Sequence, residues 1–170
     1  KASAKKTSSR VGEGRPRMDA REKVTGAALY ADDIQFGNKL LFARIKRSPH
    51  PHALIKKVDV TKALALPGVK AVVTGEDFPG FIGLYLKDRH IFCRDRVRYV
   101  GDPVAGVAAV NPEIAEQAVN LIEVEYEILQ PVLDPEFGAS SQAPLLHPDL
   151  REYTVASFIL PRPGSNISNH

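Results

Sequence analysis

Cysteine is almost missing from this sequence, and long hydrophobic runs are missing altogether. The single cysteine among the 170 residues, Cys93, cannot form an internal disulfide, which is typical of proteins from a reducing cytoplasm. No stretch of about 18 apolar residues occurs, so no transmembrane helix is predicted. Residues 1–10 are polar and basic and lack the apolar core of a secretory signal. These absences predict a cytoplasmic protein, in which Cys93 is interpreted as a small apolar side chain at the end of a strand.

The short motifs that mark common catalytic and nucleotide-binding sites are absent as well. The sequence contains no GxGxxG fingerprint, no P-loop and no GxSxG nucleophile turn. Gly101-Asp-Pro103 precedes an apolar run instead of following one, so it does not have the position of a nucleotide-binding loop. Asn166-Ile-Ser168 fits the N-glycosylation pattern, but that pattern has no meaning in a cytoplasmic chain.

The charge is concentrated at the amino terminus. Eight of the 23 Lys and Arg residues, but only three of the 20 Asp and Glu residues, lie within residues 1–25. Such a basic segment could bind phosphates or an acidic partner, although it is more often solvated or packed on a neighbouring domain. No aromatic residue precedes Tyr30, so base stacking has no support there and nucleic-acid binding is not expected.

Hydrophobic periodicity begins near Gly26 and predicts a series of short strands and helices. The run at 104–110 is apolar throughout and predicts a central strand buried on both faces. Asn111-Pro112-Glu113 has the cap, the first-turn proline and the first-turn acid of a helix start. Asp59 or Thr61 is expected to cap an earlier short helix, which Pro67-Gly68 ends. The predicted strands cover residues 40–47, 53–58, 69–73, 104–110 and 123–129, and the predicted helices cover residues 61–66 and a segment starting at 112.

These segments predict an α/β (α+β) domain that contains two strand–helix–strand units flanked by extended termini. We expect residues 1–25 to form an extended basic arm and residues 26–137 to form the domain itself. Beyond Pro131 the periodicity is lost, and residues 138–170 are predicted to be an irregular linker towards further domains.

Two histidines two residues apart, His50 and His52, could face one ligand on an extended chain. A metal site would need a third or fourth ligand, and no cysteine or acidic residue lies nearby with ligand spacing. His90, His147 and His170 are isolated in predicted loops. The sequence therefore predicts no metal site.

Two charged rows alternate with other residues. Glu123, Glu125 and Glu127 alternate with apolar residues, which predicts a solvated strand face and not the differing environments that acid–base catalysis requires. Arg94, Arg96 and Arg98 could form a basic strip for an anion, although a solvent face or inter-domain salt bridges are commoner. We predict no catalytic, cofactor-binding or metal-binding residue in this chain.

Five blocks of the sequence, in order and in spacing, resemble the molybdenum-binding subunits of the xanthine dehydrogenase and aldehyde oxidase family. The resemblance begins near Val11, and its features suggest bacterial members of the xanthine dehydrogenase or hydroxybenzoyl-CoA reductase type. The blocks are residues 17–33 (RMDAREKVTGAALYADD), 47–53 (RSPHPHA), 63–69 (ALALPGV), 96–105 (RVRYVGDPVA) and 122–127 (IEVEYE).

The resemblance implies an α/β hammerhead domain, in agreement with the two strand–helix–strand units. Enzymes of this family hydroxylate heterocycles, aldehydes or related substrates at a molybdenum centre bound to a pterin, and pass electrons through [2Fe-2S] clusters to FAD. The family's pterin-binding stretches and its base glutamate lie in later domains, so no such residue is transferred to this chain. The implied partners are the molybdopterin-binding domains and the iron–sulfur and flavin subunits, with no nucleic acid and no membrane.

The first functional hypothesis is therefore a structural domain of a molybdenum hydroxylase that is inactive alone. Two alternatives remain open: a free-standing binding or adaptor module acting through the basic arm, and an independent enzyme using His50, His52 or the arginine strip. The sequence is compatible with an expressed domain, a proteolytic fragment or a gene split into short and long chains. It does not identify the substrate.

Overall fold

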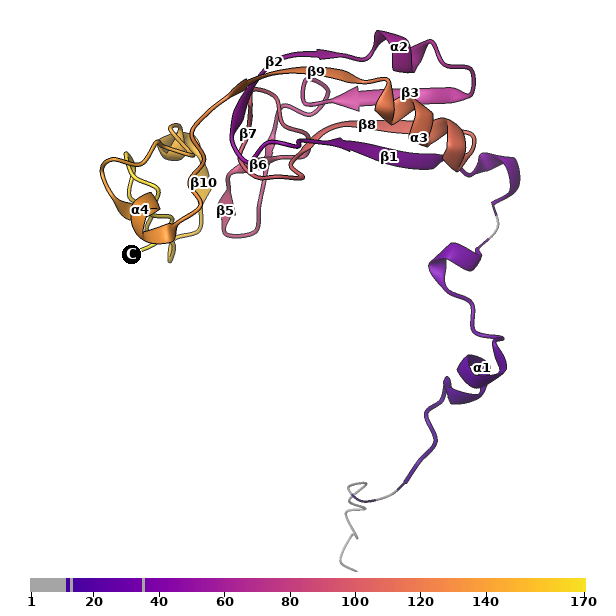
Figure 1. Ribbon diagram of the computed structural model, residues 1–170. Helices are drawn as coiled ribbons and strands as arrows, with labels where there is room; N and C mark the ends of the chain where they lie inside the picture. The colour runs from indigo at the N-terminus through magenta and orange to yellow at the C-terminus, as the bar shows by residue number, and fades with distance from the viewer. Residues whose placement is uncertain (1–11, 13, 35) are drawn as a thin grey trace, which may run out of the picture. The chain divides into compact units, whose positions relative to one another are not determined.

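The computed structural model describes residues 12, 14–34 and 36–170, and it divides at Gly37–Asn38 into two units that we describe separately (Figure 1). The helices of the described residues are α1 (Ala20–Thr25), η1 (Ala31–Asp33), η2 (Gly37–Lys39), α2 (Thr61–Leu64), α3 (Pro112–Asn120), α4 (Pro135–Ala139) and η3 (Leu150–Glu152). The strands are β1 (Phe42–Arg47), β2 (Ala53–Asp59), β3 (Val69–Thr74), β4 (Phe81–Ile82), β5 (Leu86–Lys87), β6 (Arg89–His90), β7 (Arg96–Val97), β8 (Pro103–Ala109), β9 (Glu123–Ile128) and β10 (Thr154–Val155).

The first unit has local structure where an extended arm was expected. Helix α1 lies inside residues 1–25 and ends at Gly26, whose φ of +74° is the left-handed conformation that glycine adopts most easily. The Asp19 carboxylate accepts hydrogen bonds from Arg17 and pairs with Lys23. The expectation of an extended segment is therefore wrong for residues 20–25, while residues 1–11 and 13 of the predicted arm lie outside the described residues.

The second unit contains two three-stranded antiparallel sheets, with strand orders β1-β8-β3 and β7-β2-β9. Both predicted strand–helix–strand units are present, as β2–α2–β3 and β8–α3–β9. In each unit, however, the two strands belong to different sheets, because β2 pairs with β9 and β3 pairs with β8. Each sheet therefore contains strands from both strand–helix–strand units, and neither of these units forms a separate sheet.

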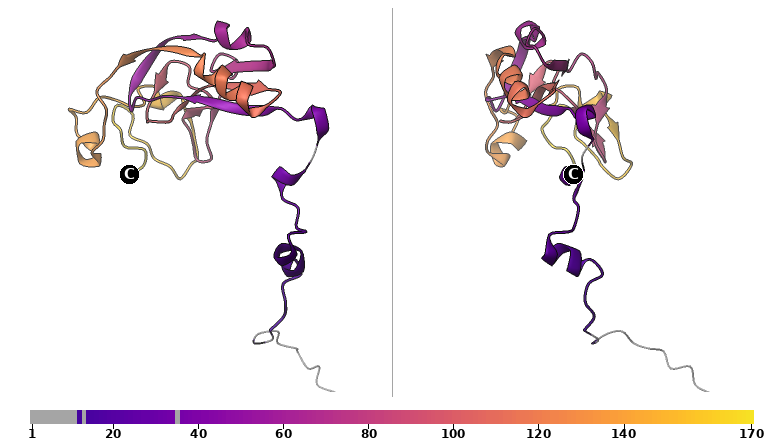
Figure 2. Two further views of the ribbon diagram at one scale, coloured as in Figure 1. Left: turned by 45° about the vertical axis from the view of Figure 1, so that its right-hand side comes forward. Right: turned by 90° about the vertical axis from the view of Figure 1, so that its right-hand side faces the viewer.

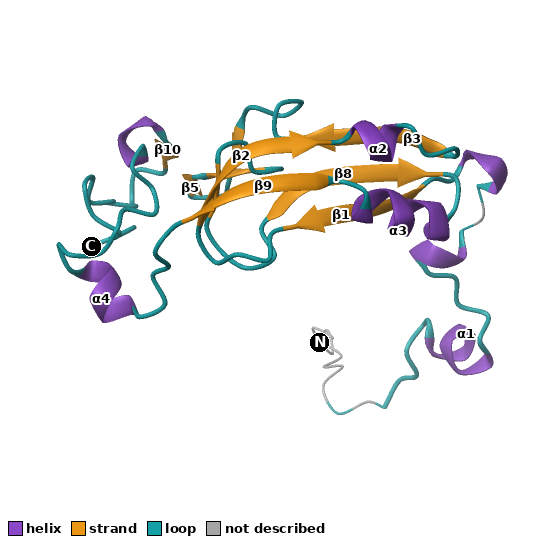
Figure 3. Cartoon of the chain, turned by 45° about the horizontal axis from the view of Figure 1, so that its top comes forward, coloured by secondary structure: helices purple, strands orange, loops and turns teal. Residues whose placement is uncertain are grey.

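The main core lies between the helices and the first sheet. Helix α3 contacts β1, β8 and α2, and Figure 3 shows α2 and α3 on the same side of the strands. The buried residues of this core are Ala63, Ala105, Val107, Ala118, Val119 and Ile122. Alanine is frequent here because a small side chain lets a short helix lie close to a strand.

Strand β8 lies between β1 and β3, and five of its seven residues are buried. The prediction of a central strand buried on both faces is confirmed. Its Val104 contributes to a second cluster together with Ala53, Cys93 and Val97. Cys93 is 5% exposed, which agrees with its interpretation as a small apolar side chain, but it lies in the loop between β6 and β7 and not at the end of a strand.

The predicted cap of α3 is present, whereas that of α2 is not. The Asn111 side chain accepts a hydrogen bond from the backbone N–H of Ile114 at 2.8 Å, and Pro112 occupies the first turn of α3. At α2 the N-cap residue is Val60, not Asp59 or Thr61 as expected, although the Asp59 carboxylate accepts from the backbone N–H of Thr61 at 3.0 Å. That contact and Lys57 lower the pKa of Asp59 to about 2.

The segment after β9 has more structure than predicted. Asp134 caps α4 by accepting from the Phe137 N–H at 2.8 Å, and β10 pairs with β5 in the loop region after β3. The expectation of loop structure beyond residue 131 is wrong for these residues. Figure 1 and the left view of Figure 2 place this segment at the end of the sheets away from α2 and α3.

None of the helices in the described ranges is long and apolar enough to cross a bilayer.

Candidate functional site

His52 is 1% exposed, and both of its ring nitrogens have partners. Nδ1 lies 2.7 Å from the Gln130 carbonyl oxygen, and Nε2 lies 3.3 Å from Nη1 of Arg96. Because a carbonyl only accepts and a guanidinium only donates, Nδ1 donates and Nε2 accepts, which assigns the neutral tautomer. The ring therefore has no free lone pair for a metal, and it links β2, β7 and the chain that follows β9.

His50 has different neighbours, so the two histidines do not converge on a common ligand. Its ring packs edge-on against Tyr126, with centroids 5.0 Å apart and planes at 74°. Its backbone is held by Ser48, whose Oγ donates to the His50 carbonyl at 3.0 Å. His50 and His52 therefore have packing contacts, not ligand-binding positions.

The turn at Ser48 interlocks with the turn at Gly101-Asp102. The Ser48 N–H donates to the Asp102 carbonyl at 2.9 Å, and the Gly101 N–H donates to the Ser48 carbonyl at 2.8 Å. Nη1 of Arg47 also donates to the Gly101 carbonyl at 2.9 Å. The Asp102 carboxylate accepts from the backbone N–H of Arg98 at 2.9 Å. Two of the five sequence blocks that carry the family resemblance thus form one hydrogen-bonded corner.

The three alternating arginines do not form a strip. Arg94 is paired with Glu76 through two hydrogen bonds of 3.2 and 3.1 Å. Nη1 of Arg96 also lies 3.3 Å from the Leu145 carbonyl, and Nε of Arg98 donates to the Leu146 carbonyl at 2.8 Å. Two of the arginines therefore hold residues 145–146 in place.

The glutamate row is exposed, as predicted. Glu123 pairs with Lys62 and Glu127 pairs with Lys56, and all four side chains are more than half exposed. The row is a solvated strand face with surface ion pairs, which contribute little to stability.

Asn166 is fully engaged inside the molecule. Its amide nitrogen donates to the carbonyls of Gly138 and Pro144 at 3.1 and 3.0 Å, and its amide oxygen accepts from the Leu146 N–H at 2.9 Å. The asparagine of the glycosylation pattern thus forms hydrogen bonds that hold the carboxy-terminal segment against residues 138–146.

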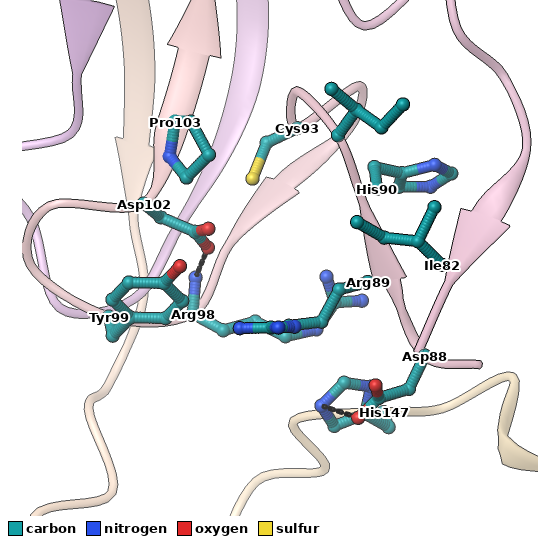
Figure 4. A pocket seen from close by; sticks show the side chains of 11 residues that line it. Ile82, Asp88, Arg89, His90, Cys93, Arg98, Tyr99, Asp102, Pro103 and His147 are labelled. Atoms are coloured by element: carbon teal, nitrogen blue, oxygen red, sulfur yellow. Dashed lines mark hydrogen bonds and ion pairs between the residues drawn. The ribbon is translucent and has the colours of Figure 1, made fainter. Parts of the chain in front are cut away.

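A cavity of about 270 Å³ with both charged and apolar lining residues lies between the β4–β6 hairpin, the Gly101-Asp102 turn and residue 147, and Figure 4 shows the side chains that line it. His147 hydrogen-bonds Tyr153 through Nδ1 at 3.2 Å, and its Nε2 lies 3.9 Å from Asp88. Burial lowers the pKa of His147, and Arg98 lowers it further. Figure 4 also shows Arg89 and Arg98 entering this space from opposite sides.

Cys93 lines the cavity but does not fit a nucleophile. Burial and the Asp102 carboxylate raise the pKa of its thiol, whereas a nucleophilic cysteine requires a lowered pKa. Cys93 does not fit an iron–sulfur site either. Such a cluster is usually held by four cysteine thiolates, and this chain has one cysteine. Within the described part of the chain no three His, Cys, Asp or Glu side chains gather as a metal site.

Sequence reasoning did not find this cavity. His90 and His147 were interpreted as isolated loop residues, yet both line it together with Asp88, Arg98 and Asp102. These residues come from three separate stretches of sequence, so no local spacing indicates them. The nearest sequence signal was the block at residues 96–105, which carried the family resemblance and therefore indicated a fold and not a site.

The comparisons with known proteins agree with the resemblance. A family model described as "Aldehyde oxidase and xanthine dehydrogenase, a/b hammerhead domain" matches residues 25–130. A probable xanthine dehydrogenase subunit of Bacillus subtilis is 45% identical over 137 residues, which are 79% of this chain and 18% of that protein. A nicotinate dehydrogenase large molybdopterin subunit of Eubacterium barkeri is 35% identical over 85% of this chain and 34% of that protein.

Two solved structures share the fold. A Cu,Mo-CO dehydrogenase has a TM-score of 0.79 and 31% identity, over 90% of this chain and 20% of that one. An aldehyde oxidoreductase of Desulfovibrio gigas has a TM-score of 0.71 and 29% identity, over 79% of this chain and 16% of that one. The chain thus spans between about a sixth and a third of the proteins it matches here.

Proposed function

This chain belongs to the aldehyde oxidase and xanthine dehydrogenase family, whose a/b hammerhead domain it contains, and we propose that it is a structural part of the large subunit of a molybdenum-dependent hydroxylase. In this role it packs on the molybdopterin-binding domains and carries no catalytic group of its own. The observation that carries the proposal is the family match over the hammerhead fold, together with His52 and Arg94, which are held by internal hydrogen bonds, and Cys93, which lies in the core.

The exposed apolar residues support a role in assembly. Large apolar side chains that are at least 39% exposed include Phe81, Leu84 and Phe158 in the second unit. A free-standing domain rarely leaves this many large apolar groups in water, because each one forgoes the free energy gained by burial. A surface of this kind is suited to a protein neighbour.

The cofactors of the whole enzyme are then molybdopterin-bound molybdenum, [2Fe-2S] clusters and FAD, all held outside this chain. Relatives of the chain carry names such as "large molybdopterin subunit" and "subunit gamma" of a dehydrogenase complex, which support a hetero-oligomeric enzyme. We further propose a cytoplasmic location. We keep residues 26–137 as the domain, residues 1–25 as the arm and residues 138–170 as the connection to the cofactor-binding part.

The adaptor alternative receives no specific support. Arg17 and Lys23 of the basic arm pair with Asp19, so these two cations are partly neutralised by a neighbour. No observation on the described residues favours an independent enzyme either.

The proposal is tested by the native mass and metal content of the protein purified from its source. We expect the chain to purify with further polypeptide that carries molybdenum and iron. A folded, metal-free monomer with no further polypeptide attached would contradict the proposal.

A further inference from the structure

A group of exposed apolar side chains surrounds the β4–β6 hairpin, and we call it the hairpin cluster. Its members come from two segments that the fold brings together: β5 pairs with β10, and the Tyr85 and Phe158 rings meet edge-on with centroids 5.3 Å apart. The exposed fractions range from 39% for Phe81 to 84% for Leu84. The hairpin cluster consists of Phe81, Ile82, Leu84, Tyr85 and Phe158.

The cavity that contains Arg89 and Arg98 adjoins the hairpin cluster directly. Ile82 lines the cavity and pairs across the hairpin with Arg89, which also lines it. Phe81 stacks on His90, another lining residue, with ring centroids 4.3 Å apart. An apolar surface therefore borders a cavity that holds charged groups, which is the usual composition of a protein–protein contact.

The cavity has more hydrogen-bond donors than acceptors to meet them. The Arg98 guanidinium uses only its Nε, on the Leu146 carbonyl, and among the residues that the structure describes neither the Arg89 nor the Arg98 guanidinium forms an ion pair with a carboxylate within 4.0 Å. Nδ1 of His90 is buried without a partner in the same described part of the chain. The Asp102 carboxylate already accepts from the Arg98 backbone, and Asp88 lies beside His147.

The two arginines have unfilled donors and lie at the edge of an apolar surface. A carboxylate on the surface of a partner protein would therefore be a suitable acceptor for them. A guanidinium offers a planar pair of N–H donors, and a carboxylate accepts both. Closing a neighbour over the hairpin cluster would remove water from the cavity, so the arginines would then need an acceptor of opposite charge.

We propose that the hairpin cluster is the surface on which the cofactor-binding part of the enzyme docks, and that this part inserts an Asp or Glu side chain between Arg89 and Arg98. This inference rests on the proposed function and adds to it the location of the contact and the chemistry of the partner. The partner surface is apolar, with one acidic side chain at its edge.

The test uses the assembled enzyme and measures how tightly this chain is retained, as the dissociation constant at several salt concentrations. Arg89→Gln removes the charge, and we expect it to raise the dissociation constant on the order of 10- to 100-fold. Arg89→Glu is expected to raise it further, and the difference between the two variants shrinks as salt increases. Arg44→Gln is the matched control, because Arg44 pairs with Glu116 on the helix-covered side and should leave the constant unchanged.

The apolar half of the proposal has its own pair of variants. Leu84→Asp should weaken retention strongly without changing the unfolding midpoint of the free chain, since Leu84 is 84% exposed. Leu64→Asp, at an exposed position of α2, should change neither the retention nor the unfolding midpoint.

The outcomes separate the two claims. If Leu84→Asp weakens retention but Arg89→Glu binds like the parent, no acidic side chain enters the cavity and that part of the proposal is overturned. If both variants bind like the parent, the docking surface is wrong while the structural role stands. If the parent chain associates with no further polypeptide, the proposed function itself fails.

Discussion

The paired sheets and the hairpin cluster use apolar residues in opposite ways. In β8 the residues from Val104 to Val107 are all buried, between two strands and against α3. In the hairpin cluster, by contrast, Leu84 and Phe158 are 84% and 63% exposed. Burial of apolar residues in the sheets stabilises the folded chain, whereas the hairpin cluster leaves apolar surface in contact with water.

This difference in burial indicates that the two regions have different roles, one in folding and the other in assembly. A residue in the sheets contributes to the free energy of unfolding of this chain, and a residue of the hairpin cluster contributes to association with a neighbour. Helix α1 of the first unit likewise buries none of its residues. Variants in the two regions should therefore affect different measurements.

The largest effect is expected for Gly106→Asp in β8. A Cβ atom at this position would lie 2.8 Å from Cζ of Phe92 and 3.2 Å from Cγ2 of Val73, and the carboxylate would be buried without a partner. We expect a loss of about 3–5 kcal/mol in the free energy of unfolding, measured by urea denaturation. Gly80→Asp is the control beside the hairpin, since its Cβ meets nothing within 4 Å; it should change stability by less than about 0.5 kcal/mol. Equal losses for the two would contradict the comparison.

Ile122→Ala should have the next largest effect. Ile122 is 1% exposed and belongs to the core between α3 and the sheet, so its truncation leaves a cavity. We expect a cost of about 2–5 kcal/mol, again by urea denaturation. Leu84→Ala removes a similar side chain from the hairpin cluster and should leave the denaturation midpoint unchanged while it weakens retention in the assembled enzyme.

Asn111→Ala should cost about 1 kcal/mol of stability, because a helix start that loses its capping side chain is destabilised by this order. The variant removes the acceptor for the Ile114 N–H in the first turn of α3. Asn111→Asp keeps an acceptor and serves as the control in the same thermal melts. A parent-like melting temperature for Asn111→Ala would show that α3 does not depend on its cap.

The smallest effect concerns pH and the carboxy-terminal segment. Burial and Arg98 lower the pKa of His147 below its ordinary value of 6.5, so the unfolded segment binds a proton more readily than the folded one. The contribution of His147 to stability is therefore complete above pH 6.5 and is lost as the pH falls from there towards the folded-state pKa. The protection factors of the amides in residues 145–155, corrected for the intrinsic pH dependence of exchange, should fall as the pH drops below about 6.5, and His147→Gln should remove that fall.

Much of the second unit could be predicted from local signals. Alternation and apolar runs located β1, β2, β3, β8 and β9, and Asn111-Pro112 located the start of α3. Sheet membership could not be predicted, because pairing of β2 with β9 joins segments about 70 residues apart and depends on tertiary packing. The Asp134-Pro135 cap of α4 was as clear a signal as Asn111-Pro112, but no periodic helix follows it.

The candidate site was hidden for a similar reason. Arg98 belongs to an alternating row for which a solvent face or inter-domain salt bridges were the commoner expectation, yet its side chain reaches the Leu146 carbonyl, 48 residues away. His147 and Asp88 have no sequence relation and meet only because residues 145–155 fold back onto the hairpin. A cavity assembled from loops in this way leaves no spacing pattern in the sequence.

The most direct test of the account is hydrogen–deuterium exchange on this chain, free and within the assembled enzyme. We expect amides of residues 14–34, 81–91 and 154–160 to gain protection on assembly, while β8 and α3 are equally protected in both states. Protection gained over α2 and α3, with residues 81–91 unchanged, would contradict the claim that the hairpin cluster is the surface made for a partner.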